Sequence, residues 1–369
     1  MRPRLLDFLV CPSCHGELSL DVFERADTAA DAEVLAGALR CRGCSAAFPV
    51  IRGVPRMLSG TLLAQMVPRY PEFFAAYSAF APEKPAHDDV LADTLDSFTR
   101  QRLDFEPPGA TVAHQWREHL ARNLGGAISL DALRGKTVLD VGCGFGRHMY
   151  VAHEHGAEVV GVDLSGGVDR AWQNNARNPR CHVVQANIFE APFRRAVFDV
   201  VWSFGVLHHM PVPRDGFRAI VPFAKSDGGL VVIWVYGYRG MALTYRLSHM
   251  RPLHRMTRGM SPEARVRASK SVAALLSAAY WEPLRLARRV GLGRAIDRLP
   301  LSAYVEHSWL GRVAAVHDRL STPITHFHDR DELAEWFASA QLHDIIVEDT
   351  QRRGWRAHGH RAPETADRA

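Results

Sequence analysis

The sequence predicts a doubly wound α/β fold with a mostly parallel sheet, preceded by a small β domain and interrupted by a helical insert. Three observations support this prediction: apolar runs alternate with helix-like stretches over 134–236, a glycine turn follows the first run, and two Cys-x-x-Cys pairs lie within residues 1–58. Runs that are apolar throughout are typical of strands buried on both faces, which occur in parallel sheets covered by helices.

Seven strands are expected in the main sheet. Five apolar runs lie in the central segment, at 137–141, 158–162, 182–185, 198–203 and 229–235. A helix over 332–340 and an antiparallel pair of strands, over 344–348 and 355–360, close the fold. Ligands bind such a sheet at the carboxyl ends of its parallel strands.

The glycine turn is the first candidate ligand site. Gly142-Cys143-Gly144-Phe145-Gly146 joins the first strand to a helix, and Asp163 ends the second strand. Glycines allow a tight turn and a close approach of the ligand, and the free N–H groups at a helix start favour an anionic group. An acid at the end of the second strand suits a bond to ribose hydroxyls. The turn alone leaves open a dinucleotide site or a purely structural role.

Four ordered motifs, at 138–146, 160–165, 185–193 and 198–210, resemble those of class I S-adenosylmethionine-dependent methyltransferases. The resemblance implies that S-adenosylmethionine is the cofactor, with Asp163 on the ribose and with Leu164 and Ile188 on either side of the adenine. Asn187 stands where the family usually has Asp; it would accept the adenine amino group without a charge, or it is simply a turn residue. The complete expected set is Asp140, Gly142, Cys143, Gly144, Gly146, Asp163, Leu164, Asn187, Ile188, Ser203, Phe204 and Gly205.

Two histidine pairs are candidates for contact with the methyl acceptor. His208 and His209 follow the fourth strand, where a base could take a proton from the acceptor; the alternative is that they only shape the loop. His326 and His328 precede the last helix and are candidate substrate-binding residues; the alternative is a solvated turn.

The cysteines near the start predict a structural zinc site. Cys11, Cys14, Cys41 and Cys44 form two knuckles that can close a tetrahedral thiolate site, with redox or buried cysteines as the alternative. The segments Leu5–Pro12 and Phe48–Pro55 resemble the small zinc-ribbon activator of tRNA, rRNA and release-factor methyltransferases. The runs 18–23 and 34–39 are expected to form a hairpin between the knuckles.

The predicted organisation has four parts. They are a zinc ribbon at 1–58, a helical linker and cofactor cap at 59–133, a methyltransferase domain at 134–361 with a basic helical lid insert at 237–325, and a disordered tail at 362–369. No run reaches the roughly 18 apolar residues of a membrane span, and six cysteines do not suggest a disulfide scaffold, so a cytoplasmic location is expected.

The acceptor is the least determined feature. The segment 239–319 has 14 Arg and 1 Lys against 3 Glu and 2 Asp, so the insert could grip an anionic group or simply be a solvated helical face. Its aromatic residues are scattered among apolar ones, which favours packing over base stacking. We therefore expect O- or N-methylation of a small-molecule or glycan acceptor. The alternatives are an RNA or translation-factor methyltransferase, and a binding module without activity. The sequence does not indicate an oligomeric state.

Overall fold

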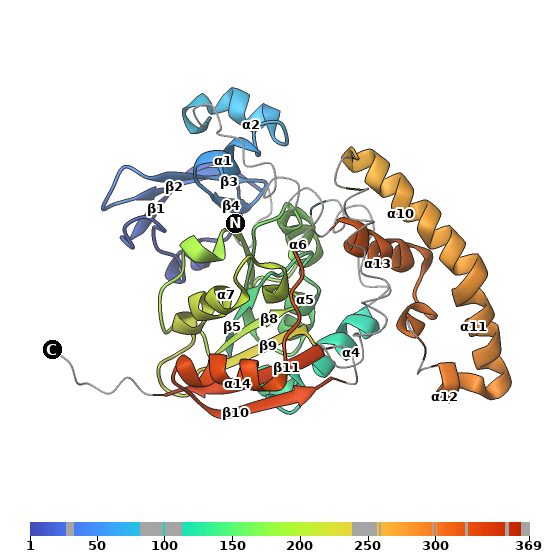
Figure 1. Ribbon diagram of the computed structural model, residues 1–369. Coiled ribbons are helices and arrows are strands. Elements are labelled where there is room, and N and C mark those ends of the chain that lie inside the picture. The colour runs from blue at the N-terminus through green and yellow to red at the C-terminus, as the bar shows by residue number, and fades with distance from the viewer. Residues whose placement is uncertain are drawn as a thin grey trace.

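A single twisted sheet runs through the centre of the computed structural model (Figure 1). The structure describes residues 1–26, 33–81, 99, 113–237, 257, 260–296, 299, 301–321, 324–350 and 354–362. Among these residues the strands lie in the order β1-β2-β3-β4-β7-β6-β5-β8-β9-β11-β10. No helix within the described ranges is long and apolar enough to cross a membrane.

The predicted doubly wound sheet is confirmed. Its parallel strands have apolar side chains on both faces, and β11 runs antiparallel to β9 and to β10, so the closing pair is antiparallel as expected. The strands are β5 (Thr137–Val141), β6 (Glu158–Asp163), β7 (Cys181–Ala186), β8 (Val200–Phe204), β9 (Leu230–Tyr236), β10 (Leu342–Asp349) and β11 (Gly354–Arg361).

The number of strands differs from the prediction, because the N-terminal β domain is continuous with the main sheet. β4 (Val54–Met57) pairs in parallel with β7, with Arg56 opposite Gln185. This pairing occupies the hydrogen-bonding edge of β7, which would otherwise be open to another chain. The predicted hairpin is also present, as the antiparallel strands β1 (Leu18–Arg25) and β2 (Val34–Cys41), and β3 (Ala47–Ile51) pairs antiparallel with β2.

Helices cover both faces of the main sheet. Alternate residues along each strand, such as Val138 and Leu139, enter different apolar clusters because successive strand side chains point to opposite faces. One face packs against α4 (Ala113–Leu124), α5 (Arg147–Glu154) and α6 (Val168–Asn175), and the other against α7 (Pro213–Ile220) and α14 (Arg330–Ser339). Two short helices, α1 (Gly60–Ala64) and α2 (Pro71–Ala76), lie over the N-terminal strands.

The insert is helical, as predicted, and has an apolar cluster of its own around Trp281 and Val313. In Figure 1 it forms an arc beside the sheet, next to α4. A π-helical turn, Ser277–Trp281, joins its first two helices into one long segment, which runs to Arg289 and ends in a kink at Val290 and Gly291 before the third helix. The helices are α10 (Pro262–Leu276), α11 (Glu282–Ala287), α12 (Gly293–Ile296) and α13 (Trp309–Ser321), which packs back against α10. Parts of the predicted cap and lid, and residues 363–369 of the predicted tail, lie outside the described residues.

Candidate cofactor site and cysteine cluster

The glycine turn between β5 and α5 has a backbone that requires glycine. Gly142, Gly144 and Gly146 have φ angles of +77°, +57° and +79°. A Cβ added at Gly142 would lie 2.2 Å from a methyl group of Val206, so this position is closed sterically as well. Cys143, within the turn, is buried.

Asp163 lies against this turn, so the two main elements of the predicted cofactor site meet in one place. One carboxylate oxygen accepts a hydrogen bond from the Gly144 N–H at 2.9 Å. The other accepts from the N–H and the hydroxyl of Ser165, at 2.8 and 2.7 Å. The carboxylate at the end of β6 is thereby fixed beside the glycine turn.

Asp140 has a buried carboxylate oxygen that finds no hydrogen-bond partner among the described residues. Burial raises the pKa of this carboxyl to about 7. The nearby Trp202 indole lowers the pKa in part, although its N–H is not in hydrogen-bonding geometry with the carboxylate. An acceptor of this kind beside a glycine turn fits the amino group of S-adenosylmethionine. The residues present therefore fit the cofactor that the sequence predicts.

The residues expected on the adenine side are brought to the same edge of the sheet. The Leu164 carbonyl accepts a hydrogen bond from the Gln185 amide at 2.9 Å, and Ile188 is buried just past β7. Asn187 uses its side-chain oxygen to accept the Phe189 N–H at 3.1 Å. This is the local turn role that we considered as its alternative, and its contact with adenine stays a prediction.

The predicted cofactor residues at the end of β8 have different roles in the structure. Ser203 is fully buried and its hydroxyl donates to the Val141 carbonyl at 3.1 Å, so its side chain ties β8 to β5. Phe204 packs edge-on against the ring of His148 in α5, and Gly205 has a φ of +80°. Their predicted contacts with the cofactor remain to be tested.

The structure brings the two predicted histidine pairs together. The His326 N–H donates to the His208 carbonyl at 2.8 Å, and the His328 N–H donates to the Tyr236 carbonyl at 3.0 Å. His209 contacts the Ile324 carbonyl through Nδ1 at 3.0 Å. The turn before α14 is therefore hydrogen-bonded to the segment after β8.

His208 is fully buried, and its ring stacks on Tyr236 with centroids 3.9 Å apart. Burial lowers its pKa well below the ordinary histidine value, and the nearby His209, His328 and His326 lower it further. The imidazole is therefore neutral at physiological pH, and its Nε2 has no hydrogen-bond partner among the residues described. A base role for His208 or His209, and acceptor binding by His326 or His328, remain predictions.

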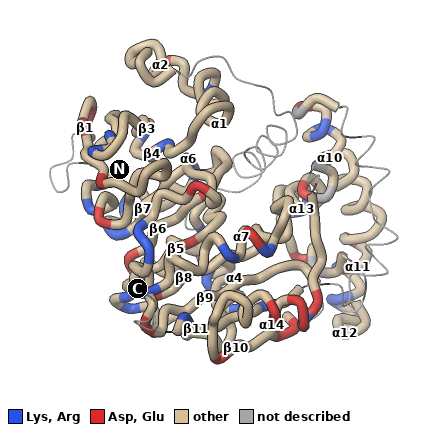
Figure 2. Tube along the Cα trace, turned by 60° about the vertical axis from the view of Figure 1, so that its left-hand side comes forward, with Lys and Arg blue, Asp and Glu red and all other residues tan. Residues whose placement is uncertain are grey.

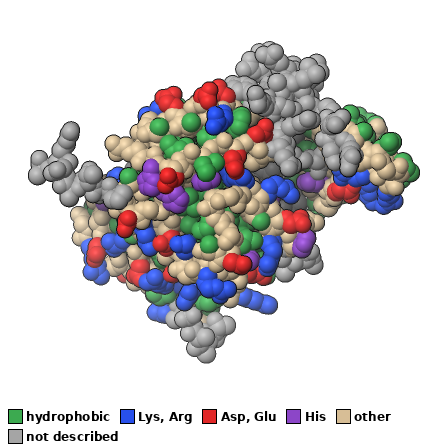
Figure 3. Space-filling view, turned by 90° about the horizontal axis from the view of Figure 1, so that it is seen from below, with side chains coloured by type: hydrophobic (Ala, Val, Ile, Leu, Met, Phe, Trp, Pro, Cys, Tyr) green, Lys and Arg blue, Asp and Glu red, His purple; other side chains and the backbone are tan. Residues whose placement is uncertain are grey.

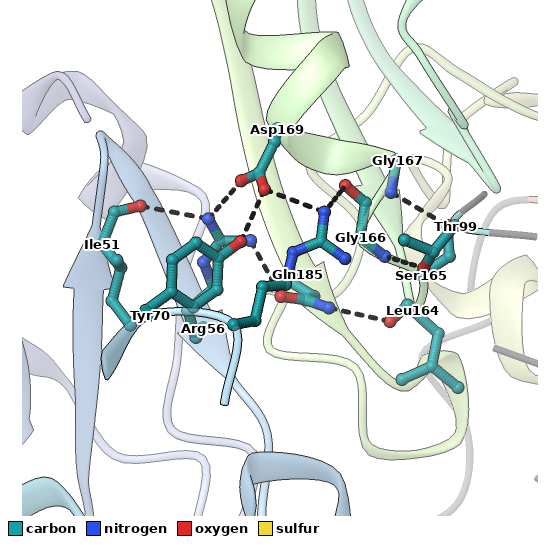
Figure 4. Close-up of polar contacts among 11 residues, drawn as sticks. Ile51, Arg56, Tyr70, Thr99, Leu164, Ser165, Gly166, Gly167, Asp169 and Gln185 are labelled. Carbon is teal, nitrogen blue, oxygen red and sulfur yellow. Dashed lines mark hydrogen bonds and ion pairs between the residues drawn. The ribbon is translucent and has the colours of Figure 1, made fainter. Parts of the chain in front are cut away.

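Sequence reasoning missed a polar network that joins the N-terminal domain to the cofactor edge (Figure 4). Arg56 of β4 is fully buried, and its guanidinium donates to Asp169 of α6 at 2.5 Å, to Gln185 at 2.9 Å and to the Ile51 carbonyl at 3.1 Å. Gln185 in turn holds the Leu164 carbonyl. The one available signal was a charged residue inside the short run 54–57.

Asp169 is the centre of that network. It also accepts from the Tyr70 hydroxyl at 2.6 Å and from Arg69 at 3.1 Å. Arg69 donates a further hydrogen bond to the Gly166 carbonyl, just after Asp163. Burial would raise the pKa of Asp169, but the Arg56 charge and the other donors outweigh it and hold this pKa below the usual range.

The four predicted zinc ligands also lie together. The sulfur atoms of Cys11, Cys14, Cys41 and Cys44 are all within 4.8 Å of one another. The separations between paired sulfurs are 3.3, 3.5 and 3.8 Å, against about 3.8 Å for two thiolates on one tetrahedral zinc. A Cβ on Gly16 would approach two of these sulfurs to 3.2 and 3.3 Å, so a side chain there would have to displace the sulfurs by a few tenths of an ångström.

Comparison with known proteins identifies two segments. A methyltransferase-domain family model matches residues 139–232, and a Trm112p-like protein model matches residues 2–53. A 24-methylenesterol C-methyltransferase from Oryza sativa is 30% identical over 52% of this chain and 54% of its own length. A tRNA U34 carboxymethyltransferase from Geobacter is 36% identical over 28% of this chain and 33% of its own. The chain thus spans about half of the first relative and a third of the second.

Among solved structures, a Haloferax volcanii complex between the Trm112 methyltransferase activator and a methyltransferase is 14% identical. The match covers 72% of this chain and 97% of that one, with a TM-score of 0.39.

These findings correct the predicted acceptor and partner. A small molecule or glycan was expected, but the Trm112p-like segment and the tRNA-modifying relatives favour RNA, which was the alternative. The sterol enzyme's name gives an acceptor of another class, but that name does not account for a Trm112p-like domain. The aromatic residues of the insert did not reveal the acceptor: among those described, Trp281, Tyr280 and Tyr304 pack in the insert's apolar cluster as expected, and Trp309 is 45% exposed. The signal for RNA lies in residues 2–53 instead.

The predicted enzyme class is confirmed by the domain match. Residues 139–232 lie within a methyltransferase domain of the S-adenosylmethionine-dependent class, and residues 2–53 are a Trm112p-like domain that precedes it in the same chain.

Proposed function

We propose that this protein transfers a methyl group from S-adenosylmethionine to RNA, with tRNA as the substrate class. The observation that carries the proposal is the Trm112p-like domain, which is joined to the methyltransferase sheet through β4 and β7. The resemblance of this domain to the activator of tRNA, rRNA and release-factor methyltransferases supports an acceptor from the translation machinery. The similarity to tRNA U34 carboxymethyltransferases favours tRNA within that group.

The cofactor would supply an electrophilic methyl group on a sulfonium. We infer that Asp163 holds the ribose hydroxyls, that the turn 142–146 receives the methionine end, and that the free oxygen of Asp140 accepts from its amino group. Leu164 and Ile188 would flank the adenine. The chain's part in the reaction is then to align the methyl group with the acceptor and to exclude water from the buried edge around it.

We infer that the four cysteines hold a structural Zn²⁺. A site with four thiolates has no open position for a substrate, so the metal would stabilise a domain too small to fold on an apolar core alone. The predicted division into a ribbon at 1–58, a cap at 59–133 and a methyltransferase domain at 134–361 is part of this proposal. The predicted cytoplasmic location is compatible with an RNA acceptor.

The test is methyl transfer to RNA in vitro. Purified protein is incubated with total bacterial tRNA and S-adenosylmethionine carrying a radiolabelled methyl group, and the labelled nucleoside is identified by mass spectrometry. We expect label in tRNA. The Asp163→Ala variant should lose both this labelling and the cofactor binding that calorimetry measures. Label that appears only in protein, or no label although the cofactor binds, would overturn the RNA proposal.

A further inference from the structure

A polar pocket with a volume of about 560 Å³ lies between α4 and the insert. Arg285, Arg288 and Arg289 line it from the long helical segment of the insert, and Gln115 lines it from α4. The turn before α13 contributes the remaining residues, Glu306, His307 and Ser308. Figure 2 shows basic stretches near α12, and Figure 3 shows Lys and Arg side chains gathered at this end of the molecule.

The pocket is cationic. Three guanidinium groups line it against one carboxylate, that of Glu306, which lies 3.3 Å from Arg288. A second carboxylate, that of Glu282, lies 3.3 Å from Arg285 and 2.7 Å from the buried Arg312. Because Arg312 offsets the charge of Glu282, the charge of Arg285 is not cancelled. Among the residues that the structure describes, the groups around the pocket therefore carry a positive excess, and guanidinium groups suit the oxygens of a phosphate.

Two further features of the same turn favour a nucleic-acid ligand. Ser308 accepts the Gly311 N–H through its hydroxyl at 3.1 Å, so α13, a helix of 13 residues, begins at the pocket with its positive end. Trp309 follows Ser308 directly and its side chain is 45% exposed. Exposed aromatic rings beside arginines are typical of surfaces that stack unpaired bases.

Packing contacts through α4 connect the pocket with the candidate cofactor site. Gln115 precedes Trp116, whose buried ring lies edge-on to Phe145 of the glycine turn, with centroids 5.8 Å apart. Helix α4 therefore lies between the pocket and the glycine turn, with Gln115 lining the pocket and Trp116 contacting the turn. The pocket is a suitable position for the part of a large acceptor that does not itself react.

We propose that this pocket binds a backbone phosphate of the RNA acceptor, with Trp309 stacking on a neighbouring base. The proposal rests on the proposed function, because it names the surface through which the acceptor is held. In this proposal the pocket contributes to the affinity for RNA, and the cofactor binds separately at the edge of the sheet. Phosphate contacts position RNA without reading its sequence, so the site should act on many tRNAs alike.

The experiment compares a pocket variant with a matched control. Arg288→Gln/Arg289→Gln removes two positive charges from the pocket, and Arg267→Gln/Lys270→Gln removes two exposed charges from the same long segment, outside the pocket. Binding of fluorescently labelled total tRNA is measured by anisotropy over a range of salt concentrations. Calorimetry with S-adenosylmethionine and thermal unfolding show whether each variant keeps its cofactor site and its fold.

We expect the pocket variant to bind tRNA roughly tenfold or more weakly, and the slope of log affinity against log salt to fall by about 2. The control variant should change both quantities little, and both variants should bind the cofactor like the parent. Trp309→Ala should weaken binding of a single-stranded RNA without changing the salt slope, because stacking releases no counterions.

Equal losses in the pocket and control variants would overturn the proposal, because they would indicate general attraction only. It would also be overturned if the pocket variant lost binding of inorganic pyrophosphate but kept tRNA affinity, since the pocket would then serve a free anion. Failure of the parent protein to methylate RNA counts against the proposed function, whereas normal tRNA affinity in the pocket variant counts against this inference alone.

Discussion

Replacing Arg56 with methionine tests whether the network in Figure 4 holds the N-terminal domain to the methyltransferase domain. Methionine fills similar space without a charge. Removal of one partner of a buried ion pair costs roughly 3–5 kcal/mol. Asp169 retains the Arg69 and Tyr70 donors, so we expect a loss in the free energy of unfolding near the lower end of this range, ~3 kcal/mol.

The opposite substitution, Asp169→Asn, should cost at least as much. It leaves the Arg56 guanidinium without its ionised partner at a position that is 0% exposed, whereas the Arg69 side chain is 23% exposed and can turn to water. The double variant should cost less than the sum of the single ones, by about 0.5–3 kcal/mol, because both remove the same contact.

The assay is thermal and urea unfolding of the full chain, with cofactor affinity measured in parallel. The matched control is Arg40→Met, which breaks an exposed pair with Asp21, whose side chains are 53% and 45% exposed; we expect its effect to stay below about 1 kcal/mol. Because Gln185 links Arg56 to the Leu164 carbonyl, Arg56→Met should also weaken cofactor binding. An Arg56→Met effect no larger than that of Arg40→Met, or strict additivity in the double variant, would refute this reasoning.

Three further predictions concern the metal and the cofactor. Cys14→Ser should lower the zinc content measured by mass spectrometry and lower the melting temperature, because three thiolates hold the ion less well; equal zinc content would contradict the assignment. Gly142→Ala should abolish cofactor binding in calorimetry, since its Cβ would lie 2.2 Å from Val206 at a φ of +77°, and a fold kept intact by circular dichroism is the control. The pKa of Asp140 is raised to about 7, so the carboxyl is protonated below that pH and ionised above it. Cofactor affinity should therefore rise with pH toward about 8, by at most tenfold per unit, and should lose this dependence in Asp140→Asn.

The main sheet could be predicted because its signals are local. Each parallel strand is a short apolar run buried on both faces, and the glycine turn and Asp163 adjoin such runs directly. The knuckle cysteines are equally local, since a Cys-x-x-Cys pair already sets the distance between two thiolates. Pairing of β4 with β7 could not be predicted, because Arg56 and Gln185 are far apart in sequence and neither residue signals the other.

Exposure within the insert could not be predicted for a related reason. Trp281 and Trp309 both stand among apolar and basic residues, yet Trp281 is 1% exposed and Trp309 is 45% exposed. The difference depends on which faces of the long segment and α13 pack together, and the insert shows no strict apolar period that would fix those faces. The insert therefore carries little information about the class of acceptor, and the correction comes from the match of residues 2–53 and from the tRNA-modifying relatives.

The N-terminal domain and the arginine pocket adjoin the methyltransferase domain at different elements. Pro12 and Ser13 of the first cysteine knuckle share a pocket with Ser59 and Glu190, next to the end of β7, whereas the arginine pocket lies between α4 and the insert. The sheet order β4-β7-β6-β5-β8 places β6 and β5, at whose ends Asp163 and the glycine turn meet, within two and three strands of β4. The Trm112p-like domain is thus continuous with the sheet that carries the candidate cofactor site, so an acceptor bound by that domain would already lie near the turn that would hold the cofactor.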